Sequence, residues 1–369
     1  MRARAGGVVL VTELADPLLI QSTQLLAMNR PVNRFPLPMS IPLALRSNLR
    51  LPVIGAPLFI VSSPKLVIEQ CKAGVIGSFP ALNARPGPVL EEWLIQINSE
   101  LQAYQQAHPD RRVAPFAVNQ IVHSSNDRLE HDVEMCRKYK VPIQITSLRA
   151  PDLVVESAHS YGGLVFHDVT NVKHAKRALQ AGVDGLILVC AGAGGHAGTL
   201  SPFALVTAVR EFYDGIIILS GAIANGAGIL AAQALGANFA YMGTRFIATQ
   251  EANASDDYKQ AILESAAEDI VYTNLFTGVH GNYLRSSIVA AGLDPDALPE
   301  ADKSKMNFGS GGSTKSKAWR DIWGSGQSVA GIHDIPPVSE LVNRLETEYS
   351  AAAARLERDS RGWFALRQT

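Results

Sequence analysis

The feature that most constrains the fold is a repeated unit that begins at Leu51. Each unit contains a short apolar segment, a loop marked by glycine or proline, an amphipathic helical pattern and a closing glycine. The apolar segments run almost without polar residues, as parallel strands do when both faces of their sheet are buried. Eight strands are predicted, at residues 52–55, 75–79, 115–119, 142–146, 164–167, 185–190, 215–220 and 239–243. Helices are predicted at residues 64–73, 89–106, 127–139, 151–160, 171–181, 202–213 and 227–235.

The alternation of eight strands with helices predicts an α/β fold, a (β/α)8 TIM barrel. Gly74, Gly182 and Gly236 stand just after predicted helices, where the chain needs a left-handed residue and glycine adopts it at little cost. An open doubly wound sheet is the alternative. It is less favoured because no GxGxxG motif follows the first strand.

The domain organisation follows from where this pattern begins and ends. Residues 1–45 are predicted as an irregular, proline-containing leader, residues 46–267 as the barrel, residues 268–335 as a lid or cap insertion, and residues 336–369 as C-terminal helices. The insertion has glycine and serine clusters and no helical or strand period. A segment of that length late in a barrel is more typical of a lid than of a linker.

Composition excludes several classes of function. Lys and Arg number 33 against 34 Asp and Glu, a net charge of −1, so no electrostatic footprint for nucleic acid or an anionic membrane exists. No membrane span is predicted. Three well-separated cysteines, Cys71, Cys136 and Cys190, indicate neither a metal site nor a disulfide framework. We therefore expect a cytoplasmic enzyme without a metal. The sequence does not determine whether the protein forms an oligomer.

Two loops after the seventh and eighth strands predict a phosphate site. Residues 219–226 read LSGAIANG and residues 241–246 read YMGTRF, and both place small residues where backbone N–H groups approach an anion. Loops at these two positions commonly form the phosphate site of a TIM barrel. The alternative is a pair of tight turns that need glycine for purely structural reasons.

His196 is the candidate catalytic residue. It lies between Gly194-Gly195 and Gly198 after the sixth strand, where the glycines let the backbone lie flat against a planar ligand. A histidine there can act as acid, base or hydrogen-bond donor. His167, at the end of the fifth strand, is a second candidate, and a buried histidine bonded to a neighbour is its alternative. Cys190 is interpreted as a packed side chain without an adjacent base.

Amides and aromatic side chains supply weaker candidates. Asn119, at the end of the third strand, is placed to hydrogen-bond a heteroaromatic ring, or else to cap a loop. The tryptophans and tyrosines around the insertion either line a substrate pocket or pack the insertion onto the barrel; they are Trp319, Trp323, Tyr272 and Tyr283.

These motifs together resemble the nitronate monooxygenases, which are FMN-dependent TIM-barrel enzymes. The resemblance rests on AGGHAG at 193–198, SGAI at 220–223 and MGTRF at 242–246, and extends to residues 56–58 and 116–119. It implies that Ala56, Pro57 and Leu58 lie near the flavin ring, that Asn119 meets its polar edge and that Gly195 lies against it. It also implies that the phosphate is held by Gly221, Ala222, Gly243 and Thr244, with His167 on the cofactor side and His196 matching the active-site histidine.

The sequence departs from the family pattern at three points. Residues 55–59 read GAPLF where many members have a Met-Gln-Gly type of loop, Ala222 replaces a second glycine, and Asp168 stands where some relatives have lysine. The expected reaction converts an alkyl nitronate and dioxygen into a carbonyl compound and nitrite. The alternative is an NAD(P)H-dependent reductase of quinones or enoyl thioesters. A flavin-free phosphosugar isomerase or aldolase is disfavoured, because the strand ends lack a lysine or paired carboxylates.

Overall fold

Eight parallel strands form a closed barrel in the computed structural model. The structure describes residues 41–301 and 321–365, all within one compact unit of residues 38–369. The barrel strands are β1 (Val53–Gly55), β2 (Gly77–Pro80), β3 (Phe116–Val122), β4 (Ile143–Leu148), β5 (Leu164–Val169), β6 (Gly185–Val189), β8 (Ile216–Ser220) and β9 (Phe239–Met242). Their order is β1-β9-β8-β6-β5-β4-β3-β2, and a parallel bridge between Ile54 and Ile76 closes the ring. The predicted TIM barrel is confirmed.

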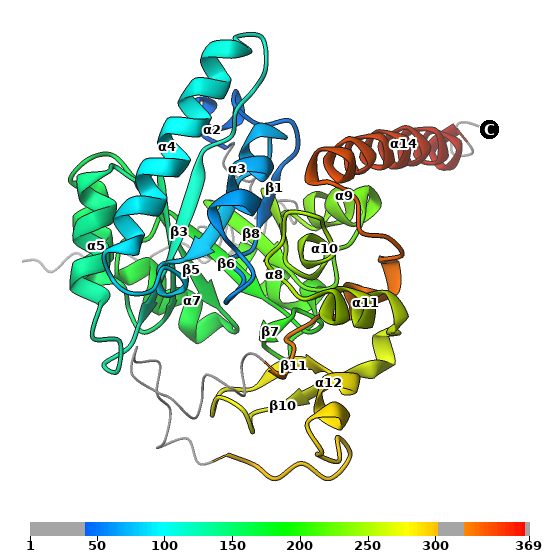
Figure 1. Ribbon diagram of the computed structural model, residues 1–369. Helices are drawn as coiled ribbons and strands as arrows, with labels where there is room; N and C mark the ends of the chain where they lie inside the picture. Colours follow the sequence, from blue (N-terminus) through cyan, green and yellow to red (C-terminus); the bar gives the residue numbers. More distant parts are fainter. Residues whose placement is uncertain (1–40, 302–320, 366–369) are drawn as a thin grey trace, which may run out of the picture. The chain divides into compact units, whose positions relative to one another are not determined.

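Helices follow the strands and lie outside them (Figure 1). They are α3 (Pro64–Lys72), α4 (Val89–Ala107), α5 (Leu129–Lys138), α6 (Asp152–His159), α7 (Val172–Gln180), α8 (Pro202–Arg210) and α9 (Gly226–Ala234). The side chains of Asn171, Ser201 and Asn225 accept a hydrogen bond from the third residue of α7, α8 and α9, respectively, which satisfies otherwise unpaired N–H groups. The helix-ending glycines 74, 182 and 236 have φ of 88°, 85° and 105°, as predicted.

The apolar strands are buried on both faces, which explains their lack of alternation. On β8, Ile216 and Ile218 belong to a cluster that also contains Ile54 and Phe239 from other strands, inside the barrel. Their neighbours Ile217 and Leu219 belong to the larger cluster between barrel and helices. The short helix α2 (Leu43–Arg46), within the predicted leader, adds Leu45 to the inner cluster; residues 1–40 lie outside the described residues.

The segment after the barrel is built onto the loop that carries His196. It follows α10 (Thr244–Ile247) and α11 (Asp256–Glu264), and contains η2 (Ala267–Asp269), β10 (Ile270–Thr273), β11 (Gly281–Leu284), α12 (Arg285–Ala290) and η4 (Gln327–Gly331). β10 and β11 form an antiparallel sheet with β7 (Gly195–His196). β7 lies in the loop after β6, so the segment after the barrel pairs with that loop through β11.

The last helix, α14 (Val338–Ala365), packs against α9 and α3. The Glu348 carboxylate on α14 accepts a hydrogen bond of 2.8 Å from the N–H of Gly226, the first residue of α9. A negative charge at a helix N-terminus is favourable, so α14 caps α9. Within the described residues, no helix has the length and apolarity needed to cross a bilayer.

Candidate active site

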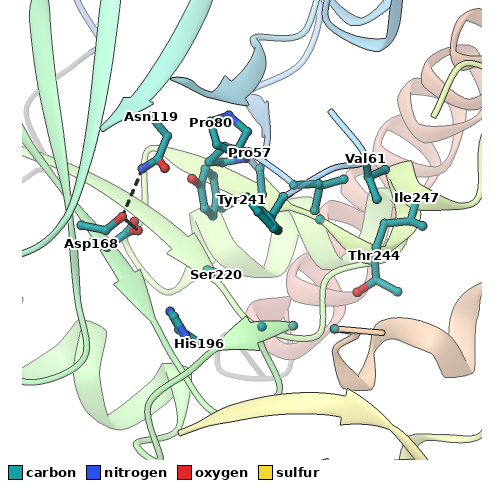
Figure 2. A pocket seen from close by; sticks show the side chains of 18 of the residues that line it. Pro57, Val61, Pro80, Asn119, Asp168, His196, Ser220, Tyr241, Thr244 and Ile247 are labelled. Atoms are coloured by element: carbon teal, nitrogen blue, oxygen red, sulfur yellow. Dashed lines mark hydrogen bonds between the residues drawn. The ribbon is translucent and has the colours of Figure 1, made fainter. Parts of the chain in front are cut away.

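A cavity of about 320 Å³ opens at the carboxyl ends of the barrel strands (Figure 2). This volume falls at the lower end of the roughly 300–1,000 Å³ typical of small-molecule sites. Among the predicted site residues, those that line it are Ala56, Pro57, Leu58, Asn119, Gly195, His196, Gly243 and Thr244. The structure thus brings together loops that are up to 188 residues apart in the chain, from Ala56 to Thr244. The carboxyl end of the barrel is where sites of this fold lie.

One wall of the cavity is a hydrogen-bonded chain from three neighbouring strands. Asn119 at β3 donates to the Ser147 hydroxyl at β4 over 3.1 Å, and Ser147 donates to the Asp168 carboxylate at β5 over 2.7 Å. Burial raises the pKa of Asp168 to about 7, although the bond from Ser147 opposes this shift. Asn119 was a candidate from sequence. Ser147 was not, although its place at a strand end signalled it.

Two polar atoms beside this wall have no hydrogen-bond partner among the described residues. They are the Oδ1 of Asp168 and the hydroxyl of Tyr241 at the end of β9, and both are buried. Buried polar atoms of proteins are nearly always paired. A ligand with a polar edge would complete this wall, and the pyrimidine edge of a flavin carries donors and acceptors of that kind. The wall therefore fits a flavin.

His196 faces the cavity from β7 and is held by the segment after the barrel. Its Nε2 lies 3.0 Å from the hydroxyl oxygen of Thr277, and that hydroxyl donates to the carbonyl of Val279 over 2.9 Å. Because the Thr277 proton is used in this way, the Nε2 of His196 donates, and Nδ1 is the basic nitrogen. Burial lowers the pKa of His196 to about 4, so the imidazole is neutral near pH 7.

The glycines beside His196 serve two different purposes. Gly195 has φ of 64°, and a Cβ there would meet no atom within 4 Å, so its bare backbone lies on the open cavity. A Cβ at Gly194 would approach the backbone nitrogen of Gly326 to 2.8 Å. Gly194 is therefore required by close approach of the later segment, a reason that the loop's own sequence does not contain.

The two predicted phosphate loops differ in how they meet the cavity. Gly243 and Thr244 line it, and so does Ser220, whereas Gly221 and Ala222 are absent from the lining residues. Ala222 has φ of 53°, a left-handed conformation that a non-glycine residue adopts only under strain. The loop after β9 thus presents its backbone to the cavity, while the loop after β8 reaches it through Ser220.

The first loop is fixed by Asn83 in η1 (Ala81–Asn83). Its amide donates to the carbonyls of Leu58 and Ser62, each over 2.9 Å, and its oxygen accepts from the N–H of Ile60. Ile60 has φ of 67°, so this clamp holds a strained turn. The turn places Ala56, Pro57 and Leu58 along the cavity.

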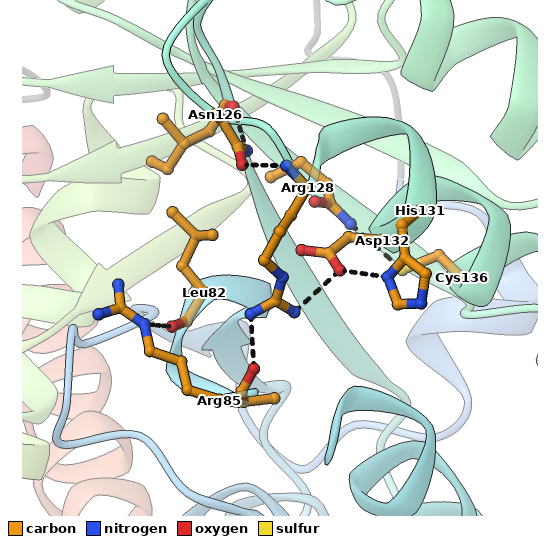
Figure 3. A network of polar contacts seen from close by, with 10 residues as sticks. Leu82, Arg85, Asn126, Arg128, His131, Asp132 and Cys136 are labelled. Atoms are coloured by element: carbon orange, nitrogen blue, oxygen red, sulfur yellow. Dashed lines mark hydrogen bonds and ion pairs between the residues drawn. The ribbon is translucent and has the colours of Figure 1, made fainter. Parts of the chain in front are cut away.

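A cation at one side of the cavity belongs to the network of polar contacts that Figure 3 shows. Arg85 is the only lysine or arginine among the cavity-lining residues of the part of the chain that the structure describes. Its Nε donates to the Leu82 carbonyl over 2.7 Å, and its pKa is lowered by burial and by the nearby charge of Arg128. Arg128 itself donates to the buried Asp132 over 2.9 Å. No sequence signal marked Arg85, which lies outside the strand ends.

The remaining candidates take other places. His167 is buried, its Nδ1 lies 2.7 Å from the Thr146 hydroxyl, and it does not line the cavity. Cys190 is buried and burial raises the pKa of its thiol to about 12, which suits a packed side chain. Trp323 lines the cavity and stacks on Tyr258, with ring centroids 5.0 Å apart. Tyr258 also lines the cavity, and sequence reasoning missed it.

The other aromatic candidates pack within the insertion. Tyr283 is fully buried against Phe276. Tyr272 donates from its hydroxyl to the Ala197 carbonyl over 3.0 Å. Trp319 lies outside the described residues.

Comparisons with known proteins bear on the family and the fold of the chain. A family model described as nitronate monooxygenase matches residues 95–348. A nitronate monooxygenase of Paraburkholderia phytofirmans is 27% identical, over 83% of this chain and 94% of its own. A 5-hydroxy-7a-methyl-1-oxo-octahydro-1H-indene-4-carboxyl-CoA dehydrogenase of Rhodococcus jostii is 24% identical, over 64% of each chain. The solved nitroalkane oxidase of Streptomyces ansochromogenes shares the fold, with a TM-score of 0.71 and 22% identity over 85% of this chain and 99% of its own.

Proposed function

The chain belongs to the nitronate monooxygenase family and is a flavin-dependent oxidoreductase, and we propose that it uses FMN to oxidise alkyl nitronates with dioxygen. The products are a carbonyl compound and nitrite. The observation that carries this proposal is the position of His196 in a glycine loop on the same cavity as the Asn119–Ser147–Asp168 wall. The cavity has a polar wall that can bind the polar edge of a flavin, and the neutral imidazole of His196 lines the same cavity.

The cofactor contacts follow from the lining. We place the polar edge of the ring at Asn119 and Asp168, its face at Gly195, and the phosphate at Gly243 and Thr244. Flavin supplies the redox chemistry between substrate and dioxygen. A monophosphate suits loops of backbone donors, and no dinucleotide fingerprint follows the first strand, which favours FMN over FAD.

The protein's own residues bind and orient the substrate. A nitronate is an anion, and Arg85 supplies a positive charge on the cavity. His196 is neutral near pH 7, and its Nδ1 accepts a hydrogen bond or a proton, while Thr277 holds the ring in place. Trp323 of the later segment and Tyr258 of α11 line the cavity and stack on each other. We place the reaction in the cytoplasm, as the sequence indicates.

The first experiment is a spectrum of the purified protein. We expect a yellow protein that releases FMN, and no FAD, when it is denatured. A colourless protein that takes up no FMN during incubation would contradict the proposal. Nitrite and carbonyl product are then measured with an alkyl nitronate under air; a flavin-loaded enzyme that forms neither would exclude this reaction while leaving the flavin assignment intact.

A second candidate function is an NAD(P)H-dependent reductase of enoyl thioesters or quinones. It is favoured by the similarity to the Rhodococcus jostii protein, whose name gives a CoA thioester as its substrate. Anaerobic oxidation of NADH or NADPH with an added acceptor separates the two candidates. Fast oxidation with an enoyl thioester or quinone, together with no nitrite from a nitronate, would favour the reductase.

A further inference from the structure

Asp168 is the only carboxylate among the cavity-lining residues of the described chain. It lies near the end of β5, where Ser147 of β4 donates to its Oδ2 and the uncharged Ile187 of β6 is its partner in register. Its Oδ1 is buried and has no hydrogen-bond partner among the described residues. Nearby charges strongly affect the protonation state of a carboxyl group that is buried in this way.

We propose that Asp168 takes up a proton from solvent when the bound flavin is reduced and releases it when the flavin is reoxidised. The inference rests on the proposed flavin site. Reduction brings two electrons from a donor and one proton to the ring, which leaves one negative charge there. An ionised Asp168 on the same buried wall would repel that charge, so its protonated form becomes favoured. The second proton therefore goes to the carboxylate oxygen of Asp168.

The pKa of Asp168 in the structure lies close to neutral pH. Burial raises the pKa of its carboxyl group to about 7, and the hydrogen bond from Ser147 keeps it from rising further. A group with a pKa near the working pH exchanges protons readily in either direction. The sequence places this acid where some relatives have a lysine, whose permanent charge would attract the reduced ring without taking up a proton.

Other titratable groups around Asp168 do not supply this proton. Tyr241 of β9 feels the charge of Asp168, and burial raises its pKa well above the usual value. His196 of β7 has a pKa of about 4, and Arg85 stays charged. His174 is on α7, which packs against β5. Its ring contacts Thr170 and Asn171, and it does not line the cavity. Near pH 7, Asp168 is the one cavity-lining group of residues 41–301 and 321–365 that is poised between two charge states.

The experiment is a potentiometric titration of the flavin in the holoenzyme, with dithionite as reductant, at pH values on both sides of 7. In a two-electron couple each proton taken up lowers the midpoint potential by about 30 mV per pH unit. Below the pKa of Asp168 one proton is taken up, which gives a slope of about 30 mV; above it two are taken up, which gives about 60 mV. Protonation of the flavin itself would change the slope in the opposite sense, from steep at low pH to shallow at high pH.

Three variants test the assignment. Asp168→Asn is expected to lose the increase in slope, because the amide keeps the shape and the bond from Ser147 but takes up no proton. Ser147→Ala is expected to keep the increase and move it to higher pH, since it removes a bond that favours the ionised form. Asp184→Asn is the control: this carboxylate binds the Val165 N–H at the other end of β5, and the wild-type profile should persist.

Each outcome bears on the inference. A flavin-loaded wild type with one constant slope, or an increase that survives Asp168→Asn, would overturn the role of Asp168 and leave the proposed function standing. A protein that binds no flavin would overturn both. If Asp168→Asn fails to hold flavin, the shift in Ser147→Ala decides, because a carboxylate with a purely structural role would leave the slope unchanged in that variant.

Discussion

Replacement of His167 should make the protein less sensitive to acid. The side chain is 4% exposed, and its pKa is lowered from 6.5 to about 4, chiefly by burial and further by the charge of His174. The unfolded chain therefore binds a proton at this site below pH 6.5, whereas the folded chain binds it only below about pH 4. Stability is consequently lost as the pH falls from 6.5 towards 4.

The size of this loss follows from the two pKa values. The difference of about 2.5 units corresponds to about 3.4 kcal/mol once both states are titrated. At pH 5 about 2 kcal/mol of that penalty is already present. His167→Gln places a polar, non-titrating side chain beside Thr146. We therefore expect the unfolding free energy of the variant to fall between pH 7 and pH 5 by about 2 kcal/mol less than that of the wild type.

The assay is urea unfolding at pH 7 and pH 5, with FMN in excess and the same ionic strength. His108→Gln is the control, since this histidine is exposed at the end of α4, and it should follow the wild type. Equal losses in His167→Gln and the wild type would refute the reasoning. Flavin content of the same variant tests the sequence-based assignment of His167 to the cofactor: loss of flavin from a folded protein would support that assignment.

Three further tests, two of them with a matched control variant, separate cofactor binding, catalysis and packing. Gly243→Asp should lose FMN through repulsion of the phosphate, whereas Gly243→Ala should retain it, because a Cβ there comes no closer than 3.4 Å to any other atom; equal flavin content by absorbance would contradict the phosphate assignment. His196→Asn should keep its flavin but lower nitronate turnover by about 10²–10⁴-fold; a wild-type rate at saturating nitronate would remove His196 from the mechanism. Gly226→Ala should lower the unfolding free energy by about 1–3 kcal/mol, because its Cβ would lie 2.1 Å from the Tyr349 nitrogen of α14. Gly228→Ala should cost less in urea unfolding, because its Cβ would come no closer than 3.2 Å to the Ile223 side chain and 3.5 Å to the Oδ1 of Asn225.

The barrel could be read from the sequence because its determinants are local. Most barrel strands are largely apolar and are buried on both faces, and each turn after α3, α7 and α9 has a glycine with positive φ. The observed strand bounds lie within three residues of the predicted ones. Residues after strand ends were also predictable as cavity candidates, because the fold collects those ends on one face.

The rest of the site depends on contacts between distant residues. β7 has only two residues, and its partner Gly281 stands 85 positions after His196. No periodic pattern in the sequence predicts a pairing of this kind. Gly194 lines the cavity, but the reason that it must be glycine is the close approach of Gly326, far along the chain. The charge state of Asp168 is set by burial and by Ser147, 21 positions away, and Arg85 enters the cavity from outside the strand-end pattern.

The pairing of β7 with β11 has a consequence for the order in which the protein is made. A chain synthesised as far as α10 already contains every barrel strand. It lacks Gly281, which pairs with His196, and Thr277, which holds the imidazole. On the ribosome, all barrel strands are therefore synthesised before His196 has these two partners. Mutations between residues 270 and 284 can thus alter the orientation of His196 while the barrel strands remain unchanged.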